Sequence, residues 1–309
     1  MLYAVIDIGS NAARLLFANA WQINNETYVE KASLIRIPLR LGNDVFSTGL
    51  ISREKAKDLV TTMQAYKLLI DVYKPAEVRV LATAAMREAS NSERILQMVR
   101  SKTKLEIKVI SGREEANIIR STNRMEIFET DKPIFFIDVG GGSTEISMVV
   151  NHKLIDLKSF KIGTLRMVHN NFSPDVWKRM ENWLKTQMKD YQDAICVGSG
   201  GNINKLNKLY GDSEAKFLTT EKLKHAFLQL SPLSVDERMN RFGFRLDRAD
   251  VIVPAAEIFL RIMNILKVEG VFVPKIGLAD GMVHILHQKF LSKNPNHNDS
   301  ISDMLESVR

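Results

Sequence analysis

The hydrophobic and polar positions of this chain alternate between short runs typical of strands and longer patterns typical of helices. Three apolar runs joined by short polar turns predict three consecutive strands: Leu2–Ile8, Ala12–Ala20 and Thr27–Arg40. Helical periodicity and further apolar runs then alternate, with Ser52 as the expected N-cap of the first helix. These later elements are helices Arg53–Tyr73, Ser92–Ser101 and Arg113–Phe128 and strands Glu77–Ala82 and Leu105–Ile110.

The three-strand opening occurs a second time, after Pro133. The predicted strands are Ile134–Asp138, Glu145–Val150 and Lys153–Lys161, and a mixed series follows. That series comprises helices Pro174–Tyr191, Asn202–Leu209, Glu221–Leu230, Arg248–Leu266 and Asp280–Leu291 and strands Ala194–Val197 and Val271–Val273. A repeat of this size favours a duplicated α/β domain over a solenoid, whose units are much shorter.

We therefore expect two α/β domains whose glycine turns face a shared cleft. The first covers residues 1–124 and the second residues 125–309, with the polar stretch 123–132 as the boundary. The C-terminal helix can pack back on the first domain.

Composition narrows the class of protein. A chain of 309 residues that is 45% hydrophobic and 26% charged is typical of two globular domains. The formal charge of +7 fits either a solvated surface or attraction to a polyanion. Cys196, the only cysteine, lies in an apolar run and is expected to be buried, so neither a disulfide framework nor a cysteine-based zinc site can form.

The sequence contains no recognisable targeting or membrane segment. Asp7 and Gly9 interrupt the first apolar run, which therefore does not resemble a signal peptide. No apolar stretch approaches the ~18 residues of a membrane span. We expect a cytoplasmic protein with no membrane partner, and no nucleic-acid partner either, because neither a reading helix nor an aromatic platform is evident.

The segment Asp138–Glu145 carries the strongest chemical signal. Its three glycines allow the backbone to approach a ligand closely, and consecutive turn amides can form an anion-binding nest. Ser143 adds a hydroxyl donor, while Asp138 and Glu145 bracket the turn with carboxylates that suit Mg²⁺. The alternative is a β-hairpin loop that only requires glycine for its turn.

Two other turns resemble this one more weakly. In Asp7-Ile-Gly-Ser-Asn11 the last two residues are also ordinary turn residues, and Arg14 can either reach an oxyanion or face solvent. Val197-Gly-Ser-Gly-Gly-Asn202 follows a predicted strand and opens a predicted helix, which aims free amides at an anion. An ordinary strand-to-helix turn explains one or two of its glycines.

Several charged residues have both a functional and a structural interpretation. Ser111 and Glu114 have capping-box spacing, so Glu114 has a structural role, whereas Glu115 is either a general base or a helix-end charge. Arg87, expected at a strand end, can clamp phosphate or lie on the surface. The run Arg238, Arg241, Arg245 and Arg248 is read first as solvated charge and second as part of a track for a long anion.

Taken together, these motifs resemble the exopolyphosphatase and guanosine pentaphosphate phosphohydrolase family. The resemblance covers residues 3–290 and rests on DIGSNAARL, ATAAMREASN, ISGREEANII, FIDVGGGSTEI, CVGSGGN, RADVIVPAAEIF and GLADGMV. It implies two ribonuclease-H-like domains of the actin, sugar kinase and heat-shock chaperone superfamily, flanking a cleft. It implies Glu115 as catalytic base and Asp138 and Glu145 as ligands of Mg²⁺ (or Mn²⁺). The implied phosphate contacts are Ser10, Asn11, Arg14, Arg87, Gly140, Gly141, Gly142, Ser143, Gly200 and Gly201.

The resemblance also implies an activity. We expect metal-dependent hydrolysis of the terminal phosphoanhydride of inorganic polyphosphate, with release of orthophosphate, by a homodimer. Longer members carry further helical domains that help to hold long polymers, and this chain lacks them, so short chains are the expected substrate. Alternatives are a guanosine pentaphosphate 5′-phosphohydrolase acting in the stringent response, a kinase or ATPase of the same superfamily, and a non-catalytic alarmone or polyphosphate sensor.

Overall fold

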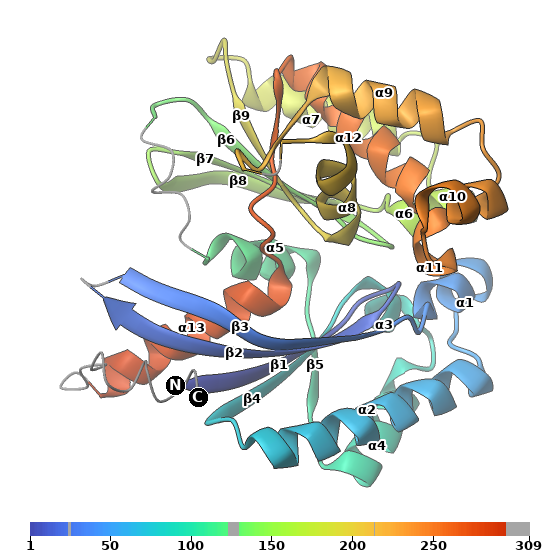
Figure 1. Ribbon diagram of the computed structural model, residues 1–309, viewed down its shortest axis with the longest axis vertical. Helices are drawn as coiled ribbons and strands as arrows, with labels where there is room; N and C mark the ends of the chain where they lie inside the picture. The colour runs from blue at the N-terminus through green and yellow to red at the C-terminus, as the bar shows by residue number, and fades with distance from the viewer. Residues whose placement is uncertain (24–25, 123–129, 213, 295–309) are drawn as a thin grey trace. The chain divides into compact units, whose positions relative to one another are not determined.

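The computed structural model describes residues 1–309 except 24–25, 123–129, 213 and 295–309 (Figure 1). The chain divides into two compact units, and the first combines Met1–Thr122 with the segment that begins at Gly277. The second unit is Asn123–Ile276. The sequence predicts a boundary after residue 124 and allows the last helix to return; in the structure α13 (Leu278–Lys293) belongs to the first unit. Most of the predicted polar boundary lies outside the described residues.

Unit 1 is built on a five-stranded sheet in the order β3-β2-β1-β4-β5 (Figure 1). β1 pairs antiparallel with β2 and parallel with β4, and its last six residues are all buried, so it forms the centre of the sheet. β2 pairs antiparallel with β3, and β4 pairs parallel with β5. The strands are β1 (Leu2–Ile8), β2 (Ala13–Ile23), β3 (Glu26–Ile37), β4 (Glu77–Ala82) and β5 (Ile107–Val109).

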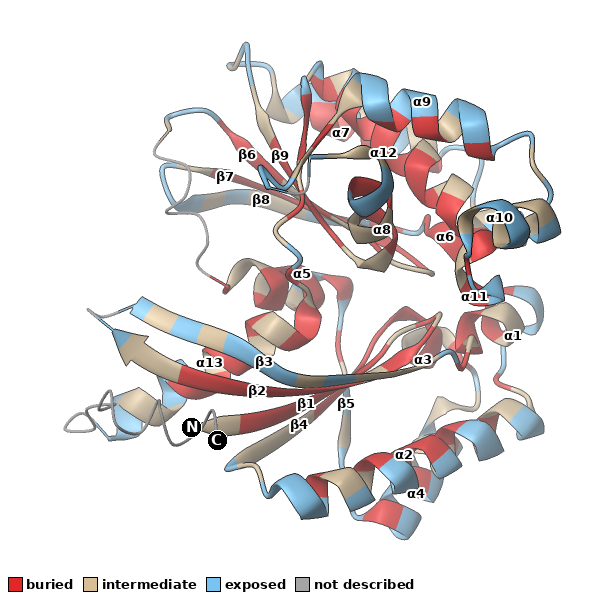
Figure 2. Cartoon of the chain, viewed as in Figure 1, coloured by how far each residue is buried: buried red, intermediate tan, exposed pale blue. Residues whose placement is uncertain are grey.

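The helices of unit 1 cover this sheet with apolar stripes. On α2 the buried residues include Leu59, Met63, Tyr66 and Ile70, which recur at helical spacing and appear as a red face in Figure 2. The buried Tyr66 hydroxyl donates to the carbonyls of Ala13 at 3.0 Å and Ile35 at 3.3 Å, which fixes α2 to β2 and β3. The helices are α1 (Leu41–Thr48), α2 (Arg53–Tyr73), α3 (Ala84–Glu88), α4 (Ser92–Thr103), α5 (Gly112–Arg120) and α13.

The last helix completes the core of unit 1. Val283 and Leu286 of α13 pack in one apolar cluster with Tyr3 and Val5 of β1 and Leu16 of β2. Because these partners lie at opposite ends of the sequence, the unit requires both of its segments to bury β1.

Unit 2 repeats this arrangement with one extra strand, in a sheet of order β10-β11-β9-β6-β7-β8 (Figure 1). β6, β7 and β8 form an antiparallel meander, β9 is parallel to β6, and β11 is parallel to β9. The predicted duplicated α/β fold is therefore confirmed. The strands are β6 (Ile134–Val139), β7 (Thr144–Val150), β8 (Lys153–Phe160), β9 (Ile195–Ser199), β10 (Phe217–Thr219) and β11 (Gly270–Phe272).

The helices of unit 2 differ from the sequence prediction in one long element and in two helices that the sequence does not predict, α6 and α10. A single helix is predicted over Arg248–Leu266, but the chain forms a short helix and then a longer one that starts at Ile252. Pro254 explains the break, because it has no N–H to continue a helix from Asp250 and is tolerated only in a first turn. The helices are α6 (Thr164–Val168), α7 (Val176–Gln187), α8 (Gly201–Tyr210), α9 (Thr220–Leu230), α10 (Val235–Phe242), α11 (Leu246–Ala249) and α12 (Ile252–Leu266).

Two further sequence predictions concern the burial of Cys196 and the absence of a membrane-spanning segment. Cys196 is buried in β9 as predicted, and burial raises the pKa of its thiol far above its ordinary value. Within the described residues, no helix has both the length and the apolar character needed to cross a membrane.

Candidate functional site

Four polar side chains form a row across four neighbouring strands of the unit 2 sheet, at the strand ends near the glycine loop. Asp138 of β6 lies opposite Glu145 of β7, and a carboxylate oxygen of each lies within 4.8 Å of the other. Ser199 of β9 pairs with Asp138 on one side, and Ser159 of β8 pairs with Glu145 on the other. Residues directly opposite one another share a face of a sheet, so Ser199, Asp138, Glu145 and Ser159 form one group, the acid row.

The two serines hold the two carboxylates in place. The Ser159 hydroxyl donates to Glu145 Oε1 at 2.7 Å, and the Ser199 hydroxyl donates to Asp138 Oδ1. Glu145 is only 2% exposed, so its charge is costly without compensation. Adjacent carboxylates repel each other unless a proton or a cation intervenes, and an all-oxygen donor set suits a hard divalent ion such as Mg²⁺. The acid row therefore fits the predicted metal site.

The corresponding row of unit 1 has a different charge pattern. Asp7 of β1 lies opposite Arg14 of β2, and Arg14 lies opposite Arg36 of β3. Arg14 Nη1 donates to Asp7 Oδ2 at 2.8 Å. Burial raises the pKa of Asp7, and the charge and hydrogen bond of Arg14 partly oppose that shift. Where unit 2 has a second acid, unit 1 thus has an arginine that neutralises its aspartate.

The glycine loop between β6 and β7 is held by its carbonyl groups. Thr164 N donates to the Gly140 carbonyl at 2.9 Å, and Leu165 N donates to the Gly141 carbonyl at 2.9 Å. The buried Arg166 donates from Nε to the Gly142 carbonyl at 2.6 Å. These bonds come from α6, a short helix that the sequence does not predict, and they fix which way the loop amides can face.

The amides of this loop are available to a ligand. Among the residues that the structure describes, the backbone N–H groups of Gly141, Gly142 and Ser143 make no hydrogen bond. Gly163 makes this geometry possible: a Cβ added there would lie 2.6 Å from the Gly141 carbonyl carbon and 2.7 Å from Gly142 N. The loop has the form expected of an anion-binding nest.

The turn between β9 and α8 lies against the acid row. A Cβ added at Gly200 would lie 3.5 Å from Asp138 Oδ1, and the φ angle of Gly200 is +105°, a conformation that favours glycine. α8 begins at Gly201, and the first amides of a helix have no intrahelical acceptor. The turn can therefore offer N–H groups and the positive end of a helix dipole to an anion.

Arg248 adds a positive charge to this turn. Its Nη2 lies 3.0 Å from the position of a Cβ built on Gly201, and its Nη1 donates to Asn202 Oδ1. In the sequence Arg248 appears as one member of an arginine run and as the first residue of the motif RADVIVPAAEIF. No local signal could have revealed its contact with a turn almost fifty residues earlier in the chain.

The glycine turn of unit 1 is fixed by the start of α1. Gly9 N donates to the Ala12 carbonyl at 3.0 Å, which closes the turn. The carbonyl of the buried Ser10 accepts from Gly42 N at 2.8 Å, and that of Asn11 accepts from Arg40 N at 3.0 Å. These two predicted phosphate contacts therefore lie in a well-defined loop.

Arg87 lies in α3 rather than at the end of a strand as the sequence suggests. β4 ends at Ala82 and the chain turns directly into a helix after Thr83. Arg87 Nη1 donates to the carbonyl of Ile110 at 2.6 Å, just before α5. At least one of its donors is thus used within unit 1, where it connects α3 to the segment that leads into α5.

Two adjacent glutamates of α5 have different environments. Ser111 and Glu114 form the predicted capping box, and the pKa of Glu114 is lowered, first by its hydrogen bond from the Ser111 backbone. Glu114 also pairs with Lys108 at 3.0 Å. Glu115 takes no part in the cap and is only 8% exposed. A buried carboxylate that takes no part in its helix cap is a candidate for chemistry.

The predicted residues thus fall into two groups. Unit 2 brings Asp138, Glu145 and Gly200 together, with the glycine loop directly after β6. Unit 1 holds the others, which are Ser10, Asn11, Arg14, Arg87 and Glu115. Four supporting residues were not recognised as such from the sequence: Ser159, Ser199, Arg166 and Arg248.

Comparisons with known proteins point to one family. Residues 32–290 match the family model described as Ppx/GppA phosphatase family. Exopolyphosphatase 1 of Mycobacterium tuberculosis is 25% identical over 92% of this chain and 87% of its own length. A guanosine-5′-triphosphate,3′-diphosphate pyrophosphatase of Photobacterium profundum is 26% identical over 100% of this chain and 63% of its own length. The crystal structure of the Aquifex aeolicus Ppx/GppA family member superposes with a TM-score of 0.72, at 26% identity over 94% of this chain and 98% of that one.

Proposed function

Because this chain belongs to the Ppx/GppA phosphatase family, we propose that it hydrolyses the terminal phosphoanhydride of inorganic polyphosphate and releases orthophosphate. Family membership confirms the prediction that the chain is a hydrolase. The choice of substrate is supported by the mycobacterial relative, which is an exopolyphosphatase by name and matches over most of both lengths. The observation that carries the proposal is the acid row lying directly beside two turns that offer backbone N–H groups.

The acid row is proposed to hold the metal. Asp138 and Glu145 would be the protein ligands of Mg²⁺ (or Mn²⁺), and Ser159 and Ser199 would orient them. When bound, the ion would supply charge neutralisation and Lewis-acid polarisation at the terminal phosphoryl group.

Phosphate binding is assigned to groups from both units. The N–H groups of Gly141, Gly142 and Ser143 would donate to oxygens of the terminal phosphoryl group. The backbone N–H groups of the Gly200–Gly201 turn, together with Arg248, would donate to the phosphate next to it. The further phosphate contacts would come from unit 1, namely Ser10, Asn11, Arg14 and Arg87.

Glu115 is proposed as the general base. Its carboxylate would accept a proton from a water molecule as the water oxygen bonds to the terminal phosphorus. The bond from that phosphorus to the bridging oxygen breaks, and the bridging oxygen leaves with the shortened chain. Because phosphoryl transfer depends mainly on positioning and charge, fixed amides and one oriented water are sufficient for the protein's part.

Hydrolysis of guanosine pentaphosphate is the second candidate. It is supported by the Photobacterium relative, although this chain spans only 63% of that protein's length. The bond broken is again a terminal phosphoanhydride, so the same residues would serve. A kinase or ATPase and a non-catalytic sensor are the candidates of other classes.

One experiment separates these functions. Orthophosphate release is measured side by side from tripolyphosphate, long polyphosphate, guanosine pentaphosphate and ATP, each with Mg²⁺, with Mn²⁺ and with a chelator. We expect metal-dependent release from the polyphosphates and little from ATP. Release from guanosine pentaphosphate alone would favour the second candidate, and binding without any release would identify a sensor.

The predicted homodimer and cytoplasmic location remain predictions. Light scattering on the purified chain would measure the subunit number, and fractionation of the source cells would locate it.

A further inference from the structure

We propose that unit 2 carries a second phosphate-binding site, which holds phosphoryl groups of a polyphosphate beyond the one being cleaved, an inference that rests on the proposed function. The site is a basic strip formed by Lys205 and Lys208 of α8 and Arg245, the residue before α11. It starts at the Gly201 turn and leads away from the acid row.

The spacing along α8 puts both lysines on one face. Lys205 and Lys208 follow Gly201 by four and seven residues, and such positions lie above one another on a helix. The strip therefore extends about 10 Å from the turn, at 1.5 Å per residue. The buried residues of α8 include Ile203 and Leu206, which point to the opposite side. Lys205 is half-buried and Lys208 is exposed.

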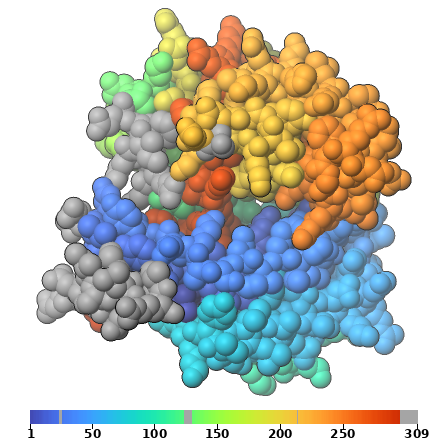
Figure 3. Space-filling view, viewed as in Figure 1, coloured from blue at the N-terminus to red at the C-terminus, as the bar shows by residue number. Residues whose placement is uncertain are grey.

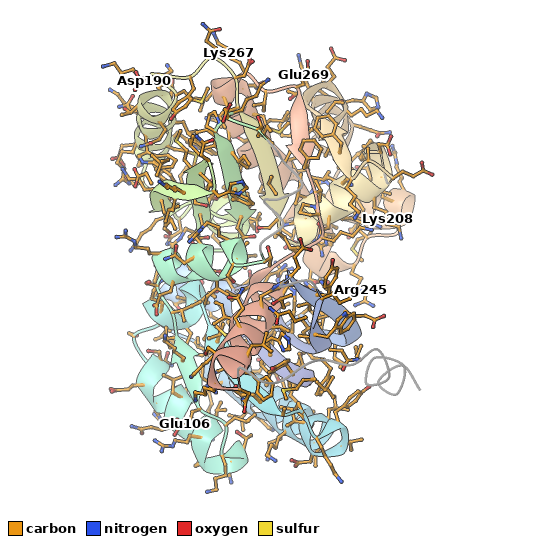
Figure 4. The ribbon with its side chains drawn as sticks, turned by 90° about the vertical axis from the view of Figure 1, so that its left-hand side faces the viewer. Glu106, Asp190, Lys208, Arg245, Lys267 and Glu269 are labelled. Atoms are coloured by element: carbon orange, nitrogen blue, oxygen red, sulfur yellow. The ribbon has the colours of Figure 1, made fainter. Side chains whose placement is uncertain are left out.

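The segment before α11 runs antiparallel to α8 and supplies the second edge of the strip. Lys205 Nζ lies 5.3 Å above the ring of Phe244, while Arg248 lies at Gly201 and donates to Asn202. Arg245 follows Phe244 and thus lies between these two contacts. Figure 4 labels Lys208 and Arg245 on the same side of unit 2, and in Figure 3 the yellow surface near α8 adjoins the orange surface of the following helices.

The positive charge of this strip has no acidic partner within the described residues. Lys205, Lys208 and Arg245 form no ion pair there. The other arginines of the same run are used differently: Arg238 donates to two backbone carbonyls and Arg241 pairs with Glu237 at 3.1 Å. Arg238 and Arg241 of this run therefore have structural partners, whereas Arg245 is available for a ligand.

The chemistry of the strip selects a polyanion without a base. Three cationic groups in a line offer ionic contacts to successive phosphates. Phe244, the ring that Lys205 faces, is only 4% exposed, so it offers little surface on which a nucleobase could stack. Inorganic polyphosphate longer than tripolyphosphate fits this description, and a guanosine nucleotide does not.

The test compares two triple variants of the full chain. The strip variant is Lys205→Gln/Lys208→Gln/Arg245→Gln. The control variant, Lys153→Gln/Lys189→Gln/Lys267→Gln, removes the same number of positive charges from exposed positions of unit 2. Of the control positions, Figure 4 labels Lys267, which lies at the other end of the unit from Arg245. Orthophosphate release is measured from tripolyphosphate and from long polyphosphate at low and high salt.

We expect the strip variant to raise KM for long polyphosphate. Exposed ionic contacts are worth about 2- to 5-fold each, which gives roughly 10- to 100-fold for three. The values of kcat for both substrates and of KM for tripolyphosphate should change less than 2-fold, and the control variant should match wild type. Because exposed charges are screened, the effect should shrink at high salt.

Other outcomes would refute the proposed phosphate-binding strip and the proposed hydrolase function separately. An equal rise in KM for both substrates, or an equal effect of the control variant, would mean general attraction by net charge and would refute the strip. An unchanged KM for long polyphosphate would refute it as well, while the proposed function stands. If wild type releases orthophosphate from neither polyphosphate, the proposed function itself fails, and the strip with it.

Discussion

Replacing Ser159 by alanine tests the metal assignment through a residue that would not itself bind the ion. The Ser159 hydroxyl donates to Glu145 Oε1 at 2.7 Å from the neighbouring strand β8. Alanine removes this donor and leaves the carboxylate, the strand pairing and the charge of the acid row in place. We expect Glu145 to lose part of its fixed orientation, so that the site binds its ion more weakly.

The magnitude follows from two independent considerations. A hydrogen bond to a charged group contributes about 1.5–3 kcal/mol. Loss of a residue that orients a metal ligand typically lowers metal affinity 10- to 100-fold, which corresponds to about 1.4–2.8 kcal/mol. Both lead us to expect a 10- to 100-fold rise in the dissociation constant of Mg²⁺ or Mn²⁺.

The assay is calorimetric titration of the metal into the full chain, with thermal unfolding of the metal-free protein alongside it. Ser159→Thr keeps a hydroxyl and should restore affinity. Ser147→Ala, on β7 two residues beyond Glu145, removes a buried hydroxyl that makes no hydrogen bond to the acid row within the described residues, and this variant should bind metal like wild type. Because Ser159 is exposed, its alanine variant should unfold within a few degrees of wild type. A metal affinity within 2-fold of wild type would refute the orienting role.

Four further predictions concern single residues. Glu115→Gln should lower turnover by about 10²–10⁴-fold if it is the general base. Glu114→Gln should cost less than about 1 kcal/mol of stability, because glutamine can still complete the capping box and only the exposed pair with Lys108 is lost, and it should have little effect on turnover. Equal rates for both would remove Glu115 from that role. Gly163→Ala should displace the glycine loop, because its Cβ would lie 2.6 Å from backbone atoms, and should cost about 1–3 kcal/mol in thermal unfolding together with most phosphate release. Tyr66→Phe should cost about 0.5–1.5 kcal/mol in urea unfolding. Since burial raises the pKa of Tyr66 from 10.0 to about 12, that difference should be full below pH 10 and lost as the pH rises through 12; a constant difference would contradict it. Cys196 should react with a thiol reagent at pH 8 only after unfolding, because burial raises its pKa; labelling of the native protein at the rate of a free cysteine would contradict its burial.

Elements defined by local signals were predictable from the sequence. β1, α2 and β4 have the predicted bounds, because apolar alternation, helical periodicity and the Ser52 cap are all contained within each segment. The capping box at Ser111 was predictable for the same reason. Helices of four or five residues, such as α3 and α11, are too short to show a period and were missed. The eight-residue helices α1 and α10 were missed as well.

The supporting residues of the site were not predictable, because strand register and long-range contacts decide them. Ser159 is an ordinary strand serine until the pairing of β7 with β8 brings it opposite Glu145. From the sequence alone, Arg14 could either face solvent or contact a ligand. Only the pairing of β1 with β2 brings it opposite Asp7. The acid pair itself was recognisable because both residues flank one glycine turn.

The position of α13 has a consequence for how the chain folds during synthesis. All of unit 2 is translated between the two segments of unit 1, and β1 remains without the apolar cover of α13 until the last helix leaves the ribosome. Unit 2 can reach its native state as soon as its own residues have emerged, whereas the first 122 residues must wait for Gly277 and beyond. A chain truncated after residue 276 would thus contain all of unit 2 but leave the apolar face of β1 in unit 1 without the cover of α13.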